Sequence, residues 1–550
     1  MDAPAIPAEP VDAVATGDDG GDVLIALRPA ATRPIPPVVR TPHSAAPAPA
    51  PVAPVVPVHW LVPVVVVVVG MFLSVLDSSI LGVALPVIGK DFYVNNEDLN
   101  WVNTSFRVSE AVVVPATAWL AARWGLRRMY LIALVLFAAF SLLTSLAWSF
   151  ESLVGLRVLQ AIPGSMTPVV SLAIIFKMVP AAKRGLALSL YGLGIISAPG
   201  LAPLIGGLLV EHGAWRTVFY VDAPLALLGL LAAWRVLPAM PGSPARRFDP
   251  LGFLSIAFGL SALVVAITQG PQWGWSSYPV LMLGTFGTLA LALFVVIELE
   301  VEHPLIELRM LTHRPYLALI ILIDIMFTGV FAVLLYLPQF LAQAQGLSPT
   351  DTGLLLLPQA LLWMAMMPLA GLLYARVGAR WPAAIGLTLT AVGTLALATI
   401  TVDTPRPELQ GWLYLRAFGL GLTVVPILAS GMTSLPPALV NDGSALRTLA
   451  QRITASLGLS LLTAMQLHQQ AQLFSDHSAL MRPGTNPLFT ELAAKGHTTL
   501  IGLWQQVTVQ AATQAYANVF LIAGALTLLG AILAAVLLPT GNPAHAQGSG

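Results

Sequence analysis

The 550-residue sequence contains no cysteine. It therefore cannot form a disulfide, a cysteine-ligated zinc site, an iron–sulfur cluster or a thiol nucleophile. Charged residues are scarce too, at 9% of the chain, against roughly 25% in an ordinary soluble domain. So few charges cannot cover a surface that faces water, and we expect lipid to surround most of the chain. Basic and acidic residues number 26 each, a balance that points to no nucleic-acid partner.

The chain also lacks the motifs of common enzyme classes. It has no Walker A loop, no H-E-x-x-H zinc motif and no G-x-S-x-G nucleophile motif. The dispersed histidines His468, His477 and His497 do not have the spacing of metal ligands, and solvated helix faces explain them better. We expect no enzymatic activity, no metal site and no cofactor.

Long apolar runs, in contrast, are abundant. Hydrophobic residues make up 57% of the chain, and the mean hydropathy is +0.82. A helix needs about 20 mostly apolar residues to cross a bilayer. Runs of this size lie near 60–85, 99–121, 129–149, 152–178, 186–210, 216–238, 250–270, 277–298, 315–341, 353–374, 381–401, 410–434, 443–466 and 516–538. The pattern predicts an all-α polytopic membrane protein with about fourteen transmembrane helices.

The two ends of the chain read differently. Residues 1–57 are rich in alanine and proline and cannot bury a core. This composition predicts a disordered tail, and its start does not resemble a secretory signal. Residues 541–550 are predicted to form a second disordered tail.

The placement of charge predicts the orientation in the membrane. With the amino terminus inside, the short outer connections contain only three basic residues, Lys90, Arg216 and Arg406. The inner connections then receive Arg123, Arg127, Arg128, Lys177, Lys183, Arg184, Arg235, Arg246, Arg247, Arg309, Arg314, Arg376 and Arg380. Because basic residues favour the cytoplasmic side, we expect both termini to be cytoplasmic.

The chain repeats itself. Residues 115–127 read PATAWLAARWGLR and residues 368–380 read PLAGLLYARVGAR, with Pro, Leu, Ala, Arg, Gly and Arg at the same places. Leu156-Arg157 is echoed by Leu415-Arg416. Both matches are eight predicted helices apart. They predict two six-helix bundles, 58–240 and 301–540, with two inserted helices in 241–300 and a substrate site between the bundles.

Seven short segments form an ordered set along residues 60–538. They read LDSSILGVALPVI at 76–88, WVNTS at 101–105, AWLAARWGLRR at 118–128, LRVLQ at 156–160, APLIGG at 202–207, WRTVFYVDAP at 215–224 and LYLPQFLAQAQGLSPTDTGLLLLP at 335–358. The set resembles the EmrB/QacA-type, fourteen-helix drug:proton antiporters of the major facilitator superfamily. The resemblance implies efflux of amphipathic drugs across the inner membrane, energised by the proton gradient. It also implies a periplasmic loop at 467–515 that works with a periplasmic adaptor protein and an outer-membrane channel.

Two embedded residues are the first candidates for proton coupling. Asp77 lies in the first predicted helix, where an ionised carboxylate costs about 2.5–3.5 kcal/mol unless it meets a partner or a cavity. Arg157 matches the R-x-x-Q pattern that the family uses in proton transfer, and its permanent charge would act on a nearby acid. The alternatives are a helix-packing acid satisfied by Ser74 or Ser78, and a structural arginine bound to backbone carbonyls.

Further charges are predicted in or near the membrane. Arg107 and Glu110 lie on one helical face, either as a self-compensating ion pair or as a proton-binding glutamate that releases the arginine. Asp324 is the next candidate for a proton site. Asp222 stands where the family commonly has Asn, and it could meet water or Arg216.

The remaining site predictions follow from the resemblance and from polarity. Gln160, Tyr336, Gln339 and Gln359 are the candidates nearest a drug pathway. An antiporter-type motif in helix five comprises Pro199, Gly200, Pro203, Gly206 and Gly207, with Ala202 in place of the first motif glycine. The cytoplasmic gate loop comprises Arg123, Gly125, Arg127 and Arg128. Its usual Asp is Ala122 in this chain, so the family's charge latch is in doubt.

Two other functions remain open from sequence alone. One is export of a single endogenous metabolite, siderophore or fatty acid. The other is a membrane sensor, although the chain has no sizeable soluble output domain.

Overall fold

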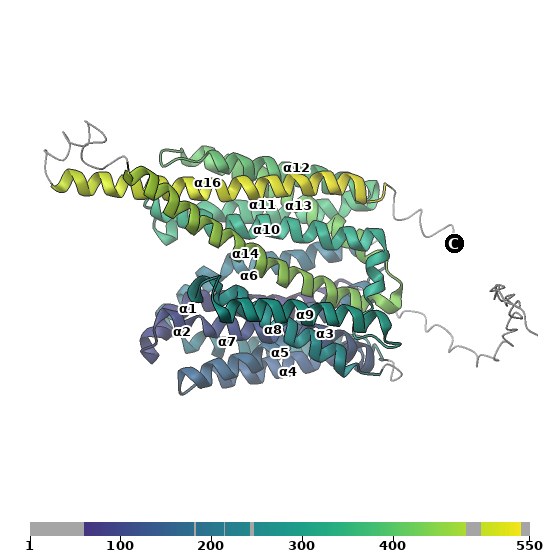
Figure 1. The fold of residues 1–550 in the computed structure, drawn as a ribbon. Coiled ribbons are helices and arrows are strands. Elements are labelled where there is room, and N and C mark those ends of the chain that lie inside the picture. Colours follow the sequence, from purple (N-terminus) through teal and green to yellow (C-terminus); the bar gives the residue numbers. More distant parts are fainter. Residues whose placement is uncertain (1–59, 181–182, 214, 243–246, 480–496, 541–550) are drawn as a thin grey trace, which may run out of the picture. The chain divides into compact units, whose positions relative to one another are not determined.

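The computed structural model describes residues 60–180, 183–213, 215–242, 247–479 and 497–540. Within these ranges it contains fourteen helices of 17 residues or more and no strand. Figure 1 labels them α1 (Leu61–Phe92), α3 (Trp101–Trp124), α4 (Leu126–Ser145), α5 (Phe150–Met178), α6 (Arg184–Gly213), α7 (Arg216–Val236), α8 (Pro250–Trp273), α9 (Tyr278–Glu300), α10 (Arg314–Gln343), α11 (Pro349–Val377), α12 (Arg380–Ala396), α13 (Arg406–Thr433), α14 (Val440–Ala479) and α16 (His497–Leu537). The all-α prediction is confirmed.

Most of these helices are long and apolar enough to span a membrane. Eleven of those in the described residues meet that description by length and composition. The other three are α3, α6 and α14. Helices α3 and α14 include the arginines and acids Arg107, Glu110, Arg447 and Arg452, and α6 is rich in glycine and proline. The charged residues of α3 and α14 suit positions inside the helix assembly.

Packing follows the internal repeat. In the first half, α1 packs on α6 and α7, α3 on α5, and α4 on α5 and α7. In the second half, α10 packs on α14 and α16, α11 on α13, and α12 on α13 and α16. Each contact in one half therefore has a counterpart in the other. The domain boundaries at residues 240 and 300 stay a prediction.

The two repeated segments also share backbone geometry. Gly125 and Gly378 occupy equivalent helix junctions, with φ of +88° and +82°, a conformation that favours glycine. After each glycine an arginine binds a carbonyl at the end of its half's last helix. Arg127 Nη2 donates to Trp234 O at 2.6 Å, and Arg380 Nε donates to Leu538 O at 2.7 Å.

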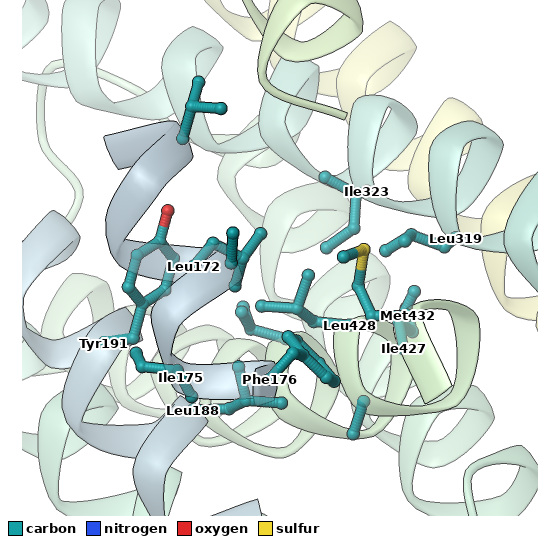
Figure 2. Packing of buried hydrophobic residues seen from close by; sticks show 14 of the residues in the cluster. Leu172, Ile175, Phe176, Leu188, Tyr191, Leu319, Ile323, Ile427, Leu428 and Met432 are labelled. Carbon is teal, nitrogen blue, oxygen red and sulfur yellow. The ribbon is translucent and has the colours of Figure 1, made fainter. Parts of the chain in front are cut away.

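The halves meet through α6 with α11 and through α3 with α14. One apolar core spans both halves at the end where α1, α4, α6 and α10 begin. Figure 2 shows its centre, where side chains of α5 and α6 face those of α10 and α13. At the opposite end the cores of the two halves are separate. The halves are therefore sealed together at one end only.

Helices α8 and α9 pack against each other as a hairpin. Helix α8 also contacts α3 and α14, one helix from each half, so the hairpin covers one seam between the halves. Other helices cover little of α9, since only 17% of the residues in its most apolar stretch are buried. Its exposed leucines and valines are suited to lipid.

The last two long helices extend beyond the predicted apolar spans into the segment 467–515, where helix faces were expected for the histidines; its periplasmic location stays a prediction. Helix α14 continues to Ala479 and α16 already begins at His497, while residues 480–496 lie outside the description. The Phe474 and Trp504 rings, 4.8 Å apart, join the two extensions. A span predicted from hydropathy ends where polar residues begin. The helix itself can continue further, because a helix surrounded by water does not need apolar residues on every face.

Candidate functional site

A central cavity of about 610 Å³ lies between the two halves. Its walls come from α1, α3, α5, α6 and α8 on one side and α10, α11, α13 and α14 on the other. Much of the lining is aromatic or aliphatic, including Phe106, Phe327, Phe331, Trp363 and Leu420. The volume falls within the range of small-molecule sites, roughly 300–1,000 Å³. The cavity can therefore hold an amphipathic small molecule.

Charged side chains enter the cavity from both halves. Glu110 of α3 forms an ion pair with Arg452 of α14, and this pair crosses between the halves. The structure adds Arg452 as an ion-pair partner of Glu110 that the sequence did not predict, and the roles predicted for Arg107 and Glu110 stay predictions. Arg107 is exposed in the cavity and lies near enough to both Glu110 and Arg452 for their charges to interact.

Two more arginines line the second half's wall. Arg447 of α14 lies near Tyr191 and near Asp324 of α10. Arg416 of α13 is 4% exposed, and its Nη2 donates to Gly329 O at 3.3 Å. Asp324 also lies near Thr454 and is absent from the described lining of the cavity.

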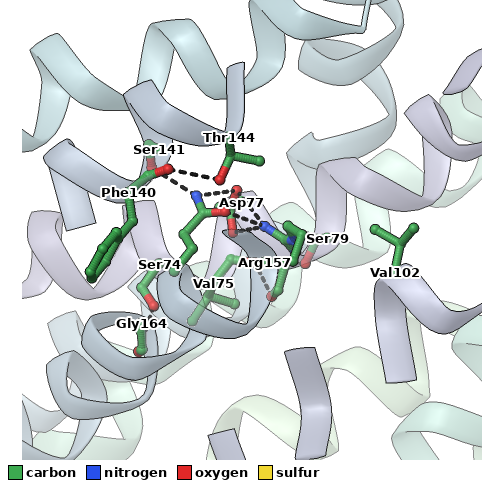
Figure 3. Close-up of polar contacts among 12 residues, drawn as sticks. Ser74, Val75, Asp77, Ser79, Val102, Phe140, Ser141, Thr144, Arg157 and Gly164 are labelled. Carbon is green, nitrogen blue, oxygen red and sulfur yellow. Dashed lines mark hydrogen bonds and ion pairs between the residues drawn. The ribbon is translucent and has the colours of Figure 1, made fainter. Parts of the chain in front are cut away.

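A fully buried polar network lies behind the cavity wall. Figure 3 shows its polar contacts around Asp77 and Arg157. Arg157 Nη1 of α5 donates to Asp77 Oδ1 at 3.1 Å and Oδ2 at 2.8 Å, and also to Gln160 Oε1 at 2.8 Å. Gln160 Nε2 donates to Asp77 Oδ1 at 3.2 Å and to Ser141 Oγ at 2.7 Å. The sequence predicted Asp77, Arg157 and Gln160 as functional candidates, and the structure brings the three together.

Asp222 of α7 joins this network. It is 3% exposed and lies against Asp77 and near Arg157, while its Oδ2 has no partner among the described residues. The prediction that it meets water or Arg216 is therefore wrong. Two carboxyl groups face one guanidinium, so the network's charge is balanced when the carboxyl groups share one proton.

Phe106 connects the network to the cavity. Its ring lines the cavity, and its centroid lies 4.0 Å from the guanidinium carbon of Arg157. Ser74 lines the cavity as well and donates to Gly164 O at 2.7 Å. A change in the Asp77–Arg157 contact can therefore alter the cavity wall directly.

Comparison with known proteins identifies the fold. The profile of the Major Facilitator Superfamily matches residues 67–459. Multidrug resistance protein Stp of Mycobacterium tuberculosis is 33% identical over 398 residues, which cover 72% of this chain and 73% of Stp. Multidrug export protein EmrB of Haemophilus influenzae is 27% identical over 409 residues, covering 73% of this chain and 79% of EmrB. The chain belongs to the major facilitator superfamily.

Solved structures agree on the fold. The major facilitator superfamily proton:xylose symporter XylE superposes with a TM-score of 0.57 at 17% identity, covering 88% of this chain and 96% of XylE. The chain is thus a multi-pass membrane transporter, and the resemblance to EmrB-type drug efflux permeases is confirmed.

Of the four residues predicted to lie near a drug pathway, Gln359 of α11 lines the cavity of this major facilitator protein. Tyr336 is buried between α10 and α14, where its hydroxyl lies 2.7 Å from Thr463 Oγ1, and Gln339 accepts from Tyr516 at 3.4 Å. The lining identified from the described residues contains neither Tyr336 nor Gln339. They support the packing of α10, α14 and α16 instead.

The two family motifs are only partly visible. Pro199, Gly200 and Pro203 belong to α6, but their surroundings lie outside the described part of the chain. Gly206 is buried, and a Cβ on Gly207 would meet nothing within 4 Å.

In the gate loop, a Cβ on Gly125 would come within 2.9 Å of Gly242 N, and Arg128 is exposed. Arg127 binds the first half's own α7, and Arg123 lies 5.7 Å from the Trp119 ring.

A third ion pair lies at the carboxyl-terminal end of α1. Asp91 Oδ2 accepts from Trp215 Nε1 at 2.8 Å and from Arg216 Nη1 at 2.9 Å. Arg216 Nη2 also donates to Ala147 O at 3.0 Å. The Trp215 hydrogen bond and then Arg216 lower the pKa of Asp91 below its usual value. This contact, together with Asp222's burial, explains why Arg216 is not the partner of Asp222.

Sequence reasoning missed Arg447 and Arg452. Both fall within the predicted span 443–466, and a charge inside an apolar span is the signal that would have marked them. The sequence identified Arg416 only as the residue that corresponds to Arg157 in the repeat, because sequence alone does not show that it lines a cavity.

Proposed function

We propose that this transporter exports amphipathic small molecules across the inner membrane in exchange for protons, with the proton gradient as its energy source and no cofactor. The observation that carries the proposal is the buried Asp77–Asp222–Arg157 network behind the wall of a central cavity. A proton added to or lost from these carboxyl groups changes the network's charge by one. That change alters the contact of α1 with α5 and α7, and so can be linked to the movement of the halves.

Direction and orientation are parts of the proposal. With both termini in the cytoplasm, the sealed end of the helix assembly faces the cytoplasm and the cavity faces outward. This state can take a proton from outside and release cargo there. The relatives named as multidrug export or resistance proteins support export over import.

The long hairpin supports a proposed partner. Helix α14 has 40 residues, and about 1.5 Å of rise per residue makes it roughly twice as long as the hydrocarbon core is thick. Its extension with α16 would stand outside the membrane. We propose it as the contact for a periplasmic adaptor protein leading to an outer-membrane channel.

The decisive experiment measures proton movement in proteoliposomes that contain a pH-sensitive dye and a panel of anionic, neutral and cationic amphipaths. The native chain should move protons when a substrate is added. Asp77→Asn should reduce that flux to the level of empty liposomes, because the network loses its proton site, while cargo binding persists.

Two variants serve as controls. Asp91→Asn removes an acid from the same helix but outside the network, so its flux should match the native chain. Asp324→Asn tests the competing candidate. A folded native protein that moves no protons with any compound would refute proton coupling, and an Asp77→Asn protein with full flux would remove Asp77 from the mechanism.

A further inference from the structure

We propose that the central cavity selects amphipathic organic anions, with Arg416 as the principal group that receives the negative charge. This inference rests on the proposed export function and specifies its substrate class. Two observations support it. The lining of the cavity has an excess of positive charge. In addition, Arg157 has a carboxylate partner, whereas Arg416, its counterpart in the repeat, has none among the described residues.

The described cavity lining contains four arginines and one acid. The arginines are Arg107, Arg416, Arg447 and Arg452, and the acid is Glu110. Glu110 is engaged by Arg452, and Arg447 has Asp324 nearby. Arg107 and Arg416 remain as an excess of positive charge. A cation entering this cavity would be repelled, and an anion would be attracted.

Arg416 stands out when the two halves are compared. Its counterpart Arg157 binds a carboxylate on α1, the first helix of its half. Arg416 reaches the equivalent first helix, α10, but it meets only the backbone carbonyl of Gly329. No carboxylate pairs with Arg416 among the described residues, and its Nε is buried without a partner.

A buried guanidinium without a counter-ion is costly. An oxyanion in the cavity would supply that counter-ion and accept charge-assisted hydrogen bonds in the planar geometry that arginine offers. The site therefore gains most from a ligand that carries a carboxylate, sulfonate or phosphate.

Trp363 adds a second unused donor to the same wall. It comes from α11, which packs on α13, and its Nε1 has no partner in the part of the chain that the structure describes. Phe327, Phe331 and Leu420 provide apolar lining. The combination of two unfilled donors and an aromatic wall fits one molecule with an anionic head and a hydrophobic body.

The test compares three ligands of nearly equal shape and different charge: 4-(1-pyrenyl)butyrate, its neutral primary amide and 4-(1-pyrenyl)butylammonium. Binding to the full chain in nanodiscs is measured by quenching of tryptophan fluorescence, with empty nanodiscs subtracted for lipid partitioning. The carboxylate should bind about tenfold more tightly than the amide, the gain expected for a charge-assisted hydrogen bond. The ammonium compound should bind most weakly.

Arg416→Gln should remove the preference for the carboxylate over the amide. Arg380→Gln is the matched control, because it also removes one arginine from the second half but lies at a helix junction outside the cavity lining. Its preference should equal that of the native chain. Retained discrimination in a folded Arg416→Gln protein would overturn the role of Arg416. The native comparison needs no variant, so a misfolded variant leaves the proposal testable.

The outcome is separable from that of the proposed function, because binding is measured without a proton gradient. Tight anion binding with no proton flux would refute the coupling and keep the substrate class. Proton flux driven by cations, with no preference for the carboxylate, would refute the substrate class and keep the coupling.

Discussion

Among the described residues, the charged side chains embedded between the helices have a partner of opposite charge or an exposed place in the cavity, as the cost of a bare charge in a membrane requires. Arg416 is the exception, because it is buried and meets only a backbone carbonyl. Asp77 and Arg157 could be found from the sequence, because a short motif surrounds each of them and embedded charges are rare. The partner of Glu110 could not, since Arg452 lies 342 positions away. Which helices face each other across the cavity is a property of the whole assembly.

The Glu110–Arg452 pair yields a prediction that separates its two possible roles. Glu110→Gln should lower stability by about 2 kcal/mol, because it leaves Arg452 without its counter-charge in a largely buried position. The double variant Glu110→Gln/Arg452→Gln should recover most of that stability. Thermal unfolding of the purified proteins measures both effects.

Transport by the same variants decides the role. If the pair only joins the two halves, the double variant should also recover proton-coupled export. A double variant that is stable but inactive would instead assign Glu110 to proton transfer, in addition to its contact with Arg452.

At the scale of helices, the close approach of α6 and α11 explains the seal at one end. A Cβ on Gly371 would lie 2.8 Å from the backbone of Gly185, and Ser189 Oγ donates to Met367 O at 2.8 Å nearby. Only glycine at both positions permits this contact. The sequence predicted the helices themselves well, because hydropathy is local, but such a contact depends on which helices are neighbours.

Gly371→Val should force α6 and α11 apart and open the sealed end, at a cost of about 1–3 kcal/mol. The absence of native cysteines allows one reporter thiol at Ala360 in the cavity. A membrane-impermeant maleimide applied from the sealed side should then label Cys at that position faster. Gly353→Val is the control on the same helix, since a side chain there meets nothing within 4 Å. Equal labelling in the two variants would show that the glycine contact is not the seal.

For the whole molecule, the repeat was the most informative part of the sequence. It predicted two related halves, and the matching pairs α4–α7 and α12–α16 have that arrangement. The lengths of α14 and α16 were not predicted, because the polar segments that extend them carry no apolar signal. The position of α8 against both halves was also beyond the sequence, because neither α8 nor α9 has a counterpart in the repeat.

The unpaired Arg416 has an electrical consequence. If the cavity carries a monovalent anion outward while a proton moves inward, both steps transfer positive charge into the cell, so two charges cross per exchange. At about 2.3 kcal/mol per charge for each 100 mV, the membrane potential would contribute roughly 4.6 kcal/mol per cycle. An inside-negative potential imposed with valinomycin should therefore drive export even when the pH is equal on both sides. Currents across a solid-supported membrane would measure it, and an exchange that produces no current would exclude this charge balance.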